Sequence, residues 1–512
     1  MKRRLSLSIV LLIAVLGSVS FAVSASPPKS GSPCSKLGKI QIFAGKKFTC
    51  IKSGKRVVWN KGILQKIPSP SPSPTSRVDV VNPNPSPAAS VSQPSITNSP
   101  AIPSSPSSYA ESPKYAPVSD CKIPDGRIDK TLNFDHFERN NGFPLQGALL
   151  PTTGVVNFLT FFVDFSDAIG SDKDIEYFRS QEEVFKNWFQ VASYGKLKAE
   201  ITSANKWFRA SKPSAEYILS SSNYGNHPKF AQEFIDLTKT NFNWRNVDAF
   251  IIHFPEKNNL QLQSAQLGRN VLLETHQGAL RMNYQYYGPW QYQFAREVKN
   301  KYPNYWAAQW LHENLHDLGL TLHAPGNGLN TGVGQSQLSY SLALNAWELF
   351  KLGWIVDNQV YCAPLSTLNT SIIKLLPLEI NGDGDRIAVI PISQFKALVI
   401  ESRRPVGLSK DWPITMSGIF VYKIDTTSVT DRSEEFKGSA LDNGNNIKYP
   451  KWAFYLSPDD RRVDSSLPAS KLDPDKFYQE WLMRVGETIT TDRVKIKFLI
   501  SNGYDFVEIS KR

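Results

Sequence analysis

The sequence has little of several residue types, and each shortage narrows its interpretation. Seven histidines in 512 residues make a chance pair at metal-binding spacing uncommon. No cysteine ahead of the large domain is evidently placed to block an active site, so inhibition by a prosegment is not indicated. Beyond residue 25 no run approaches eighteen consecutive apolar residues, and we therefore expect no membrane span in the mature chain.

The first 61 residues contain no acidic side chain. Their lysines and arginines already sum to the net charge of +12, so the rest of the chain is neutral on balance. At the very start, Lys2, Arg3 and Arg4 precede an apolar run and small residues that end at Ala25. This layout is typical of a secretory signal over residues 1–25. We expect a secreted, extracellular protein that begins near Ser26, and association with the cell wall is compatible with this.

After the signal, the positive charge belongs to a small segment, residues 34–63. Three short apolar runs separated by Ala-Gly and Ser-Gly turns predict strands, and Cys34 and Cys50 are close enough in sequence to staple them. A basic miniature β module outside the cell suits contact with anionic cell-envelope polymers. The alternative is a solvated spacer that has no partner.

Residues 64–118 are rich in proline and serine, a composition that predicts an extended, disordered linker. The other two cysteines, Cys121 and Cys362, bracket the large domain, and we expect them to pair. Free thiols are the alternative, but an oxidising compartment disfavours them.

The rest of the chain divides into an α/β domain, residues 119–364, and a β-rich domain, residues 365–512. Two continuous apolar runs, 155–165 and 247–254, have the character of buried strands, and helical spacing lies between them. Residues 271–275 suggest a further strand, at an edge that could hold an extended peptide. We therefore expect a mixed sheet with helices, followed by a β-sandwich whose strands begin at about Ser371.

The central feature of the α/β domain is a predicted helix from Trp306 to Leu318, which Gly319 would end. On it, His312 and His316 are four residues apart and so lie one turn above each other. Two imidazoles at this spacing can bind zinc, and Glu313 is placed to take a proton from a zinc-bound water. A buried helix whose histidines satisfy local hydrogen bonds is the alternative.

A catalytic zinc usually has three protein ligands. His323 is the first candidate for the third, because Gly319 lets the backbone reverse, although the usual HExxHxxGxxH pattern would place a histidine at Leu322. Glu348 is the rival, on a second short helix that follows a glycine-rich loop. In that loop, Tyr340 could assist an oxyanion or could simply pack.

Other polar groups have weaker signals. The turns around Asp383 and Asp385, and residues 442–445, have the composition of calcium (Ca²⁺) sites, which tight turns share. The histidines at 136, 227, 253 and 276 have no metal-binding spacing, and we interpret them as structural or surface residues.

With these residues in view, the chain from about Cys121 to Asp425 resembles the immune inhibitor A family of secreted bacterial zinc metallopeptidases. The resemblance rests on pieces in the same order along the chain: residues 162–167, 193–197, 312–320, 346–354, 400–403 and 418–422. It implies a zincin fold and a zinc endopeptidase, with His312 and His316 as ligands and Glu313 as the catalyst.

Two departures from the family pattern concern the loop after the helix. Residues 320–323 stand where family members usually have a Leu-Pro-Asp type segment. The loop also lacks the methionine that family members tend to carry beneath the zinc, and Val333 or Leu338 would have to occupy that position.

We therefore predict a zinc-dependent endopeptidase that acts on protein or peptide substrates and not on nucleic acid. A processing peptidase of narrow specificity is one alternative, and a non-catalytic extracellular zincin-like binding or adhesion protein is another.

Overall fold

The structure of the protein is a computed structural model that describes a defined set of residues. They are residues 32–34, 37, 40–43, 46–53, 56–61, 63–64, 109–114, 116–126, 140–219, 227–238, 240–262, 266–298, 300, 303–320, 343–410, 417–427, 453–461, 481–491 and 493–512. They fall in two compact units, Met1–Pro94 and Ser95–Arg512, which we treat separately. The predicted signal, residues 1–25, and most of the predicted linker lie outside the described residues.

The first unit contains a small antiparallel sheet. Its order is β1 (Ile40–Phe43), β2 (Lys46–Ser53) and β3 (Arg56–Trp59), and β4 (Ile63–Leu64) also pairs with β2. The core is made of Phe48, Cys50 and Trp59, and the predicted disulfide between Cys34 and Cys50 is confirmed. Because the described residues of this unit bury few side chains, the disulfide contributes to the stability of the strands.

The α/β part of the second unit is built on a five-stranded mixed sheet. Four strands run parallel, and the edge strand β10 is antiparallel to its neighbour β11. The order across the sheet is β10 (Gln266–Thr275), β11 (Gly278–Tyr286), β8 (Ala249–His253), β5 (Gly154–Asp164) and β6 (Leu197–Arg209). The two apolar runs became β5 and β8, and the segment expected at an edge became part of β10.

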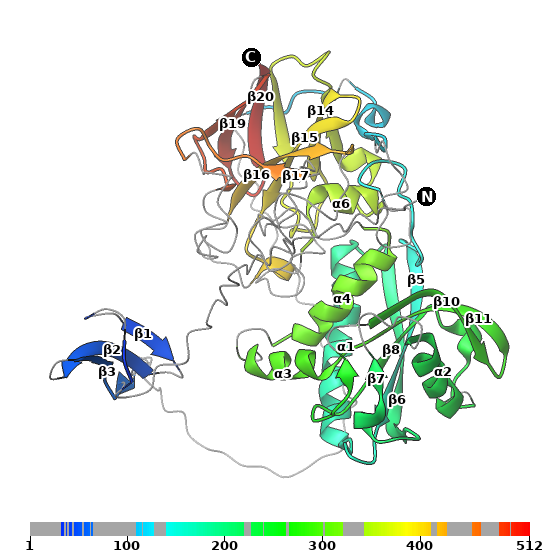
Figure 1. Ribbon diagram of the computed structural model, residues 1–512. Helices are drawn as coiled ribbons and strands as arrows, with labels where there is room; N and C mark the ends of the chain where they lie inside the picture. The colour runs from blue at the N-terminus through cyan, green and yellow to red at the C-terminus, as the bar shows by residue number, and fades with distance from the viewer. Residues whose placement is uncertain are drawn as a thin grey trace, which may run out of the picture. The chain divides into compact units, whose positions relative to one another are not determined.

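Helices cover both faces of this sheet (Figure 1). α1 (Asp172–Ala192) and α4 (Tyr305–Asp317) pack on one face. There the ring centroid of Phe158 in β5 is 5.0 Å from the ring centroid of Phe185 in α1. α2 (His227–Thr238) lies on the other face, and α3 (Pro289–Val298) leads into α4. The short strands β7 (Ile218–Leu219) and β9 (Gln261–Leu262) form a separate parallel pair.

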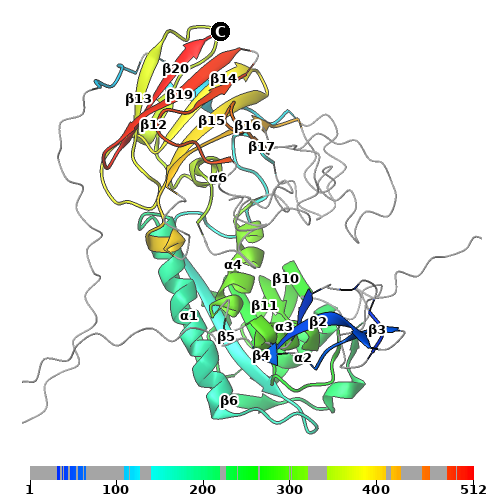
Figure 2. The same ribbon diagram turned by 90° about the vertical axis from the view of Figure 1, so that its left-hand side faces the viewer.

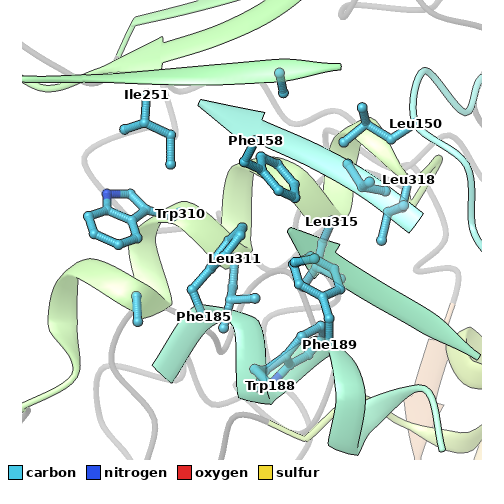
Figure 3. Close-up of a cluster of buried hydrophobic side chains, with 14 of the residues drawn as sticks. Leu150, Phe158, Phe185, Trp188, Phe189, Ile251, Trp310, Leu311, Leu315 and Leu318 are labelled. Atoms are coloured by element: carbon cyan, nitrogen blue, oxygen red, sulfur yellow. The ribbon is translucent and has the colours of Figure 1, made fainter. Parts of the chain in front are cut away.

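The packing between α1, α4 and the sheet is dense and aromatic. Figure 3 shows Trp310, Leu311, Leu315 and Leu318 directed at side chains of α1, β5 and β8. All four are fully buried. The position of α4 is therefore fixed by a large apolar core, so its polar residues do not determine where the helix lies.

The β-rich part is a sandwich of two sheets that share one apolar core (Figure 2). This confirms the predicted β-sandwich. The first sheet contains β12 (Val360–Cys362), β14 (Ile387–Ser393), β15 (Lys396–Arg403), β16 (Gly418–Asp425) and β17 (Ala453–Tyr455). The second contains β13 (Ser371–Leu375), β20 (Asp505–Lys511), β19 (Val494–Ser501) and β18 (Thr488–Thr490). β12 precedes residue 365, where we expected the sandwich to begin.

The end of the predicted linker differs from the expectation of disorder. Ser112 donates its backbone N–H to Ile372 at 2.8 Å, and Lys114 forms an ion pair with Asp385. Residues 109–114 and 116–118 are therefore attached to the sandwich. The reason is a set of long-range contacts that composition does not encode.

The second predicted disulfide, between Cys121 and Cys362, is also confirmed. It joins the start of the α/β part to β12 in the sandwich. Within the part of the chain that the structure describes, no helix is long and apolar enough to cross a membrane.

Candidate metal centre

α4 forms and ends as its sequence predicts. Every residue from Tyr305 to Asp317 is buried, and the helix stops at Leu318. Gly319 then adopts φ +93°, and an added Cβ there would stand 3.1 Å from the carbonyl oxygen of Gln146. Both the left-handed backbone and the close approach favour glycine, which explains why the chain can turn at this point.

The two histidines of the motif face each other on adjacent turns. The ring centroids of His312 and His316 are 5.0 Å apart, and their rings are nearly perpendicular. Potential ligand atoms of His312, Glu313 and His316 all lie within 4.8 Å of one another. This is the single cluster of potential metal-binding side chains found among the described residues.

The donor set fits a zinc ion in its chemistry. His316 places Nδ1 3.3 Å from the carbonyl oxygen of Leu320, the first residue after the glycine turn. A hydrogen bond there fixes the tautomer and leaves Nε2 with its lone pair for a metal. His312 and His316 are only 3% and 2% exposed, so few of their ring atoms contact solvent.

Two carboxylates lie on the same face of α4 and share one cation. Glu313 and Asp317 are one turn apart, and Arg269 reaches both from the edge strand β10. Its Nε is 2.8 Å from Oδ1 of Asp317, and its Nη2 is 3.6 Å from Oε2 of Glu313. Arg269 therefore restrains the side chain that the sequence predicts as the general base.

Arg269 can reach the helix because β10 is irregular where it lies. The register against β11 shifts between Gly268 and Val271, and Asn270 has φ +52°. A bulge of this kind redirects side chains relative to the regular alternation of a strand. Nothing in the sequence signalled this role, although Asp317 could have been noticed because it directly follows the motif.

A buried tyrosine stands close to the same carboxylates. Tyr287 donates its hydroxyl to Oε1 of Gln285 at 2.5 Å and packs against Trp306. Burial raises the pKa of Tyr287 well above its usual value, and the negative charge of Glu313 adds to this effect. The phenol is consequently neutral at physiological pH and serves as a hydrogen-bonding group.

Glu348, the rival third ligand, lies on α6 (Ala346–Lys351) and has a local partner. Asn345 donates its side-chain N–H to Oε2 of Glu348 at 3.0 Å, and its side-chain Oδ1 accepts the backbone N–H of Glu348 at 2.8 Å. Among the described residues, Glu348 is not part of the cluster that contains the two histidines. His323, the first candidate, lies outside the described residues, as do Val333, Leu338 and Tyr340.

The first turn of α6 is held by the sandwich. Glu401 of β15 accepts the backbone N–H of Ala346 at 2.7 Å and the hydroxyl of Tyr422 at 2.9 Å. Arg403 forms ion pairs with both Glu401 and Glu379 inside this buried cluster. Burial raises the pKa of Glu401, and the Arg403 charge opposes that rise.

The weaker candidates fall away from the cluster. Asp385 already faces the ammonium of Lys114, and residues 442–445 lie outside the described residues. His253 is buried, and its ring centroid is 4.2 Å from that of Phe178 and 5.1 Å from that of Trp310, which agrees with a structural role. His276 is exposed, and His136 lies outside the described residues.

Comparison of the sequence with known proteins found no match. No protein-family model matches the chain. No curated protein matches its sequence either. The cluster of His312, Glu313 and His316 on a buried helix beside a mixed sheet is therefore the feature from which function has to be argued.

Proposed function

We propose that the chain is a secreted zinc-dependent endopeptidase of the zincin type. The observation that carries the proposal is the grouping of two imidazoles and one carboxylate within 4.8 Å on α4. A mixed sheet with an antiparallel edge strand beside this helix supports it. The resemblance to the immune inhibitor A family, which rests on the same motif, points the same way.

His312 and His316 would hold the ion, with His323 as the third ligand and Glu348 as the alternative. When bound, zinc lowers the pKa of its water to about 7 and polarises the carbonyl of the scissile peptide bond. Glu313 accepts the proton of the attacking water and then returns it to the leaving amine. Arg269 keeps the Glu313 carboxylate oriented, because it pairs with Asp317 and contacts Glu313 at the same time.

The edge strand offers a place for the substrate backbone. β10 has a partner only on its β11 side in the described sheet, so an extended peptide can add to its other side by main-chain hydrogen bonds. Because β10 also supplies Arg269, the strand that would bind substrate is the one that contacts the proposed general base.

Substitution of Glu313 by Gln tests the proposal directly. We expect cleavage of a mixed peptide library to fall by at least about a hundredfold, while elemental analysis finds zinc content unchanged. Glu183→Gln, at an exposed position of α1, is the matched control and should retain activity. A wild-type protein that holds zinc and cleaves no library member would instead favour a non-catalytic binding protein.

The third ligand is resolved by the same elemental analysis. We expect His323→Ala to lose zinc and Glu348→Ala to keep it. The opposite pattern would assign the position to Glu348 and leave the peptidase proposal intact.

A further inference from the structure

The first unit presents a concentrated positive surface that the proposed peptidase chemistry does not use. Residues 34–63, here called the basic module, carry eight lysines and arginines, and no acidic residue occurs before Asp79. Among the described residues of the basic module, Lys52, Arg56 and Lys61 are exposed. A charge of one sign at this density raises the local potential by several kT and attracts polyanions.

The basic module is a folded frame. β2 and β3 form a hairpin in which Lys52 pairs with Val57 and Ser53 pairs with Arg56, so Lys52 and Arg56 lie close to its tip. Below it, Phe48, Cys50 and Trp59 form the core, and the disulfide between Cys34 and Cys50 closes it. Lys52 and Arg56 occupy adjacent positions on the two strands of the hairpin, so their backbone positions are less than one Debye length, about 10 Å, apart.

These properties favour a module that binds a partner over a spacer that has none. A solvated spacer needs charge of either sign for solubility, and it needs neither a fold nor a disulfide. Repulsion among eight cations destabilises a fold in which three buried side chains form the core among the described residues. An ordered frame of this kind keeps Lys52, Arg56 and Lys61 at fixed spacing, and fixed spacing is what binding to a repeating polyanion requires.

The kind of cation indicates the kind of anion. Seven of the eight are lysines and one is arginine. Lysine binds phosphate as a point charge, whereas arginine is favoured where a carboxylate or phosphate is bound by two parallel hydrogen bonds, and only one of the eight cations can bind in that second way. The predicted secretory signal places the basic module outside the cytoplasm, where the polyanions it meets belong to the cell envelope.

We propose that the basic module binds a phosphodiester-linked polymer of the cell envelope and thereby holds the secreted chain at the cell surface. This inference is independent of the peptidase proposal, because it uses none of the residues of α4.

Binding of the mature full-length chain to immobilised poly(glycerol phosphate) tests the inference. Each lysine–phosphate contact contributes roughly 0.7 to the slope of log K against log salt. If about five cations engage, affinity falls roughly a hundredfold between about 50 and 200 mM salt. The variant Lys52→Gln/Arg56→Gln/Lys61→Gln should lower the slope by about two and weaken binding at least about tenfold at about 100 mM salt.

A matched variant of the second unit separates local recognition from general charge. Lys173→Gln/Lys495→Gln/Lys497→Gln removes three exposed lysines there and should bind like wild type. Lys52→Arg/Lys61→Arg should also retain binding, because it keeps the charge. Free-thiol titration of every variant checks that both disulfides are intact.

Three results would overturn the inference. Equal weakening by the two triple variants would mean that the charge of the whole chain is responsible. Absence of binding at about 50 mM salt would mean that the basic module is a spacer. Tighter binding to double-stranded DNA than to poly(glycerol phosphate), at equal phosphate concentration, would assign the surface to nucleic acid.

Discussion

Arg269, which contacts two carboxylates of α4, leads to a prediction about the free energy of unfolding that does not depend on any enzymatic activity. Arg269 contacts Asp317 at 2.8 Å and Glu313 at 3.6 Å, and all three side chains are only 11–12% exposed. Arg269→Met keeps much of the apolar stem and removes the charge. Glu313 and Asp317, one turn apart on the helix, are then left as like charges that repel each other.

The expected magnitude follows from burial and distance. Breaking a buried ion pair by removing one partner costs about 3–5 kcal/mol, and partial exposure of these side chains reduces this to roughly 2–3 kcal/mol. The shorter contact should dominate. We expect a coupling energy of about 1–2 kcal/mol between Arg269→Met and Asp317→Asn, and below about 1 kcal/mol between Arg269→Met and Glu313→Gln.

Urea unfolding in the presence of a chelator, followed by tryptophan fluorescence, measures these energies. Trp306 and Trp310 on α4 are buried and report on the helix. Lys229→Met, at an exposed position of α2, is the control and should change stability by less than about 0.5 kcal/mol. Coupling to Asp317 below about 0.5 kcal/mol, or weaker than coupling to Glu313, would refute the reasoning.

The remaining predictions concern metal removal, the pH dependence of stability, and the contributions of a disulfide and a buried ion-pair cluster to stability. Dialysis against a chelator should abolish peptide hydrolysis, and added zinc should restore it; activity that survives complete metal removal would contradict the proposed function. Burial lowers the pKa of His253 to about 3, against 6.5 for an ordinary histidine, so the unfolded chain binds the proton first and stability is lost as pH falls below 6.5. His253→Phe should therefore lose roughly 2 kcal/mol less than wild type between pH 6.5 and 4.5 in urea titrations, and parallel pH profiles would count against this assignment. Cys121→Ser/Cys362→Ser opens a loop with a sequence separation of 241 and should lower the free energy of unfolding by up to about 5 kcal/mol, visible as a lower Tm. Glu401→Gln leaves Arg403 with one carboxylate fewer and should cost about 2–4 kcal/mol by the same measurement, whereas a change below about 0.5 kcal/mol would show that the cluster is not coupled to folding.

The sequence was most informative where one element carried its own periodicity. The apolar spacing of α4 and the glycine at 319 predicted the helix and its end, and the i, i+4 histidines predicted that their rings would meet. Continuous apolar runs predicted β5 and β8 for the same reason. Such features depend on residues close in the chain, so no tertiary contact has to be known to predict them.

Arg269 could not be predicted, because its role depends on distant contacts. It stands 48 positions before Asp317, and it reaches the helix through a bulge whose left-handed Asn270 has no sequence signature. The attachment of residues 109–114 and 116–118 to the sandwich was missed for a similar reason. Proline and serine suggested disorder, whereas Ser112 and Lys114 bind partners more than 250 positions away.

The bridge between Cys121 and Cys362 also determines how the chain responds to damage. It makes the whole α/β region one covalent ring that starts and ends beside the sandwich. A single cut anywhere in that ring opens the ring without releasing a fragment. The two pieces would separate on a gel only after reduction, so a nicked molecule can keep its helix and its histidines together.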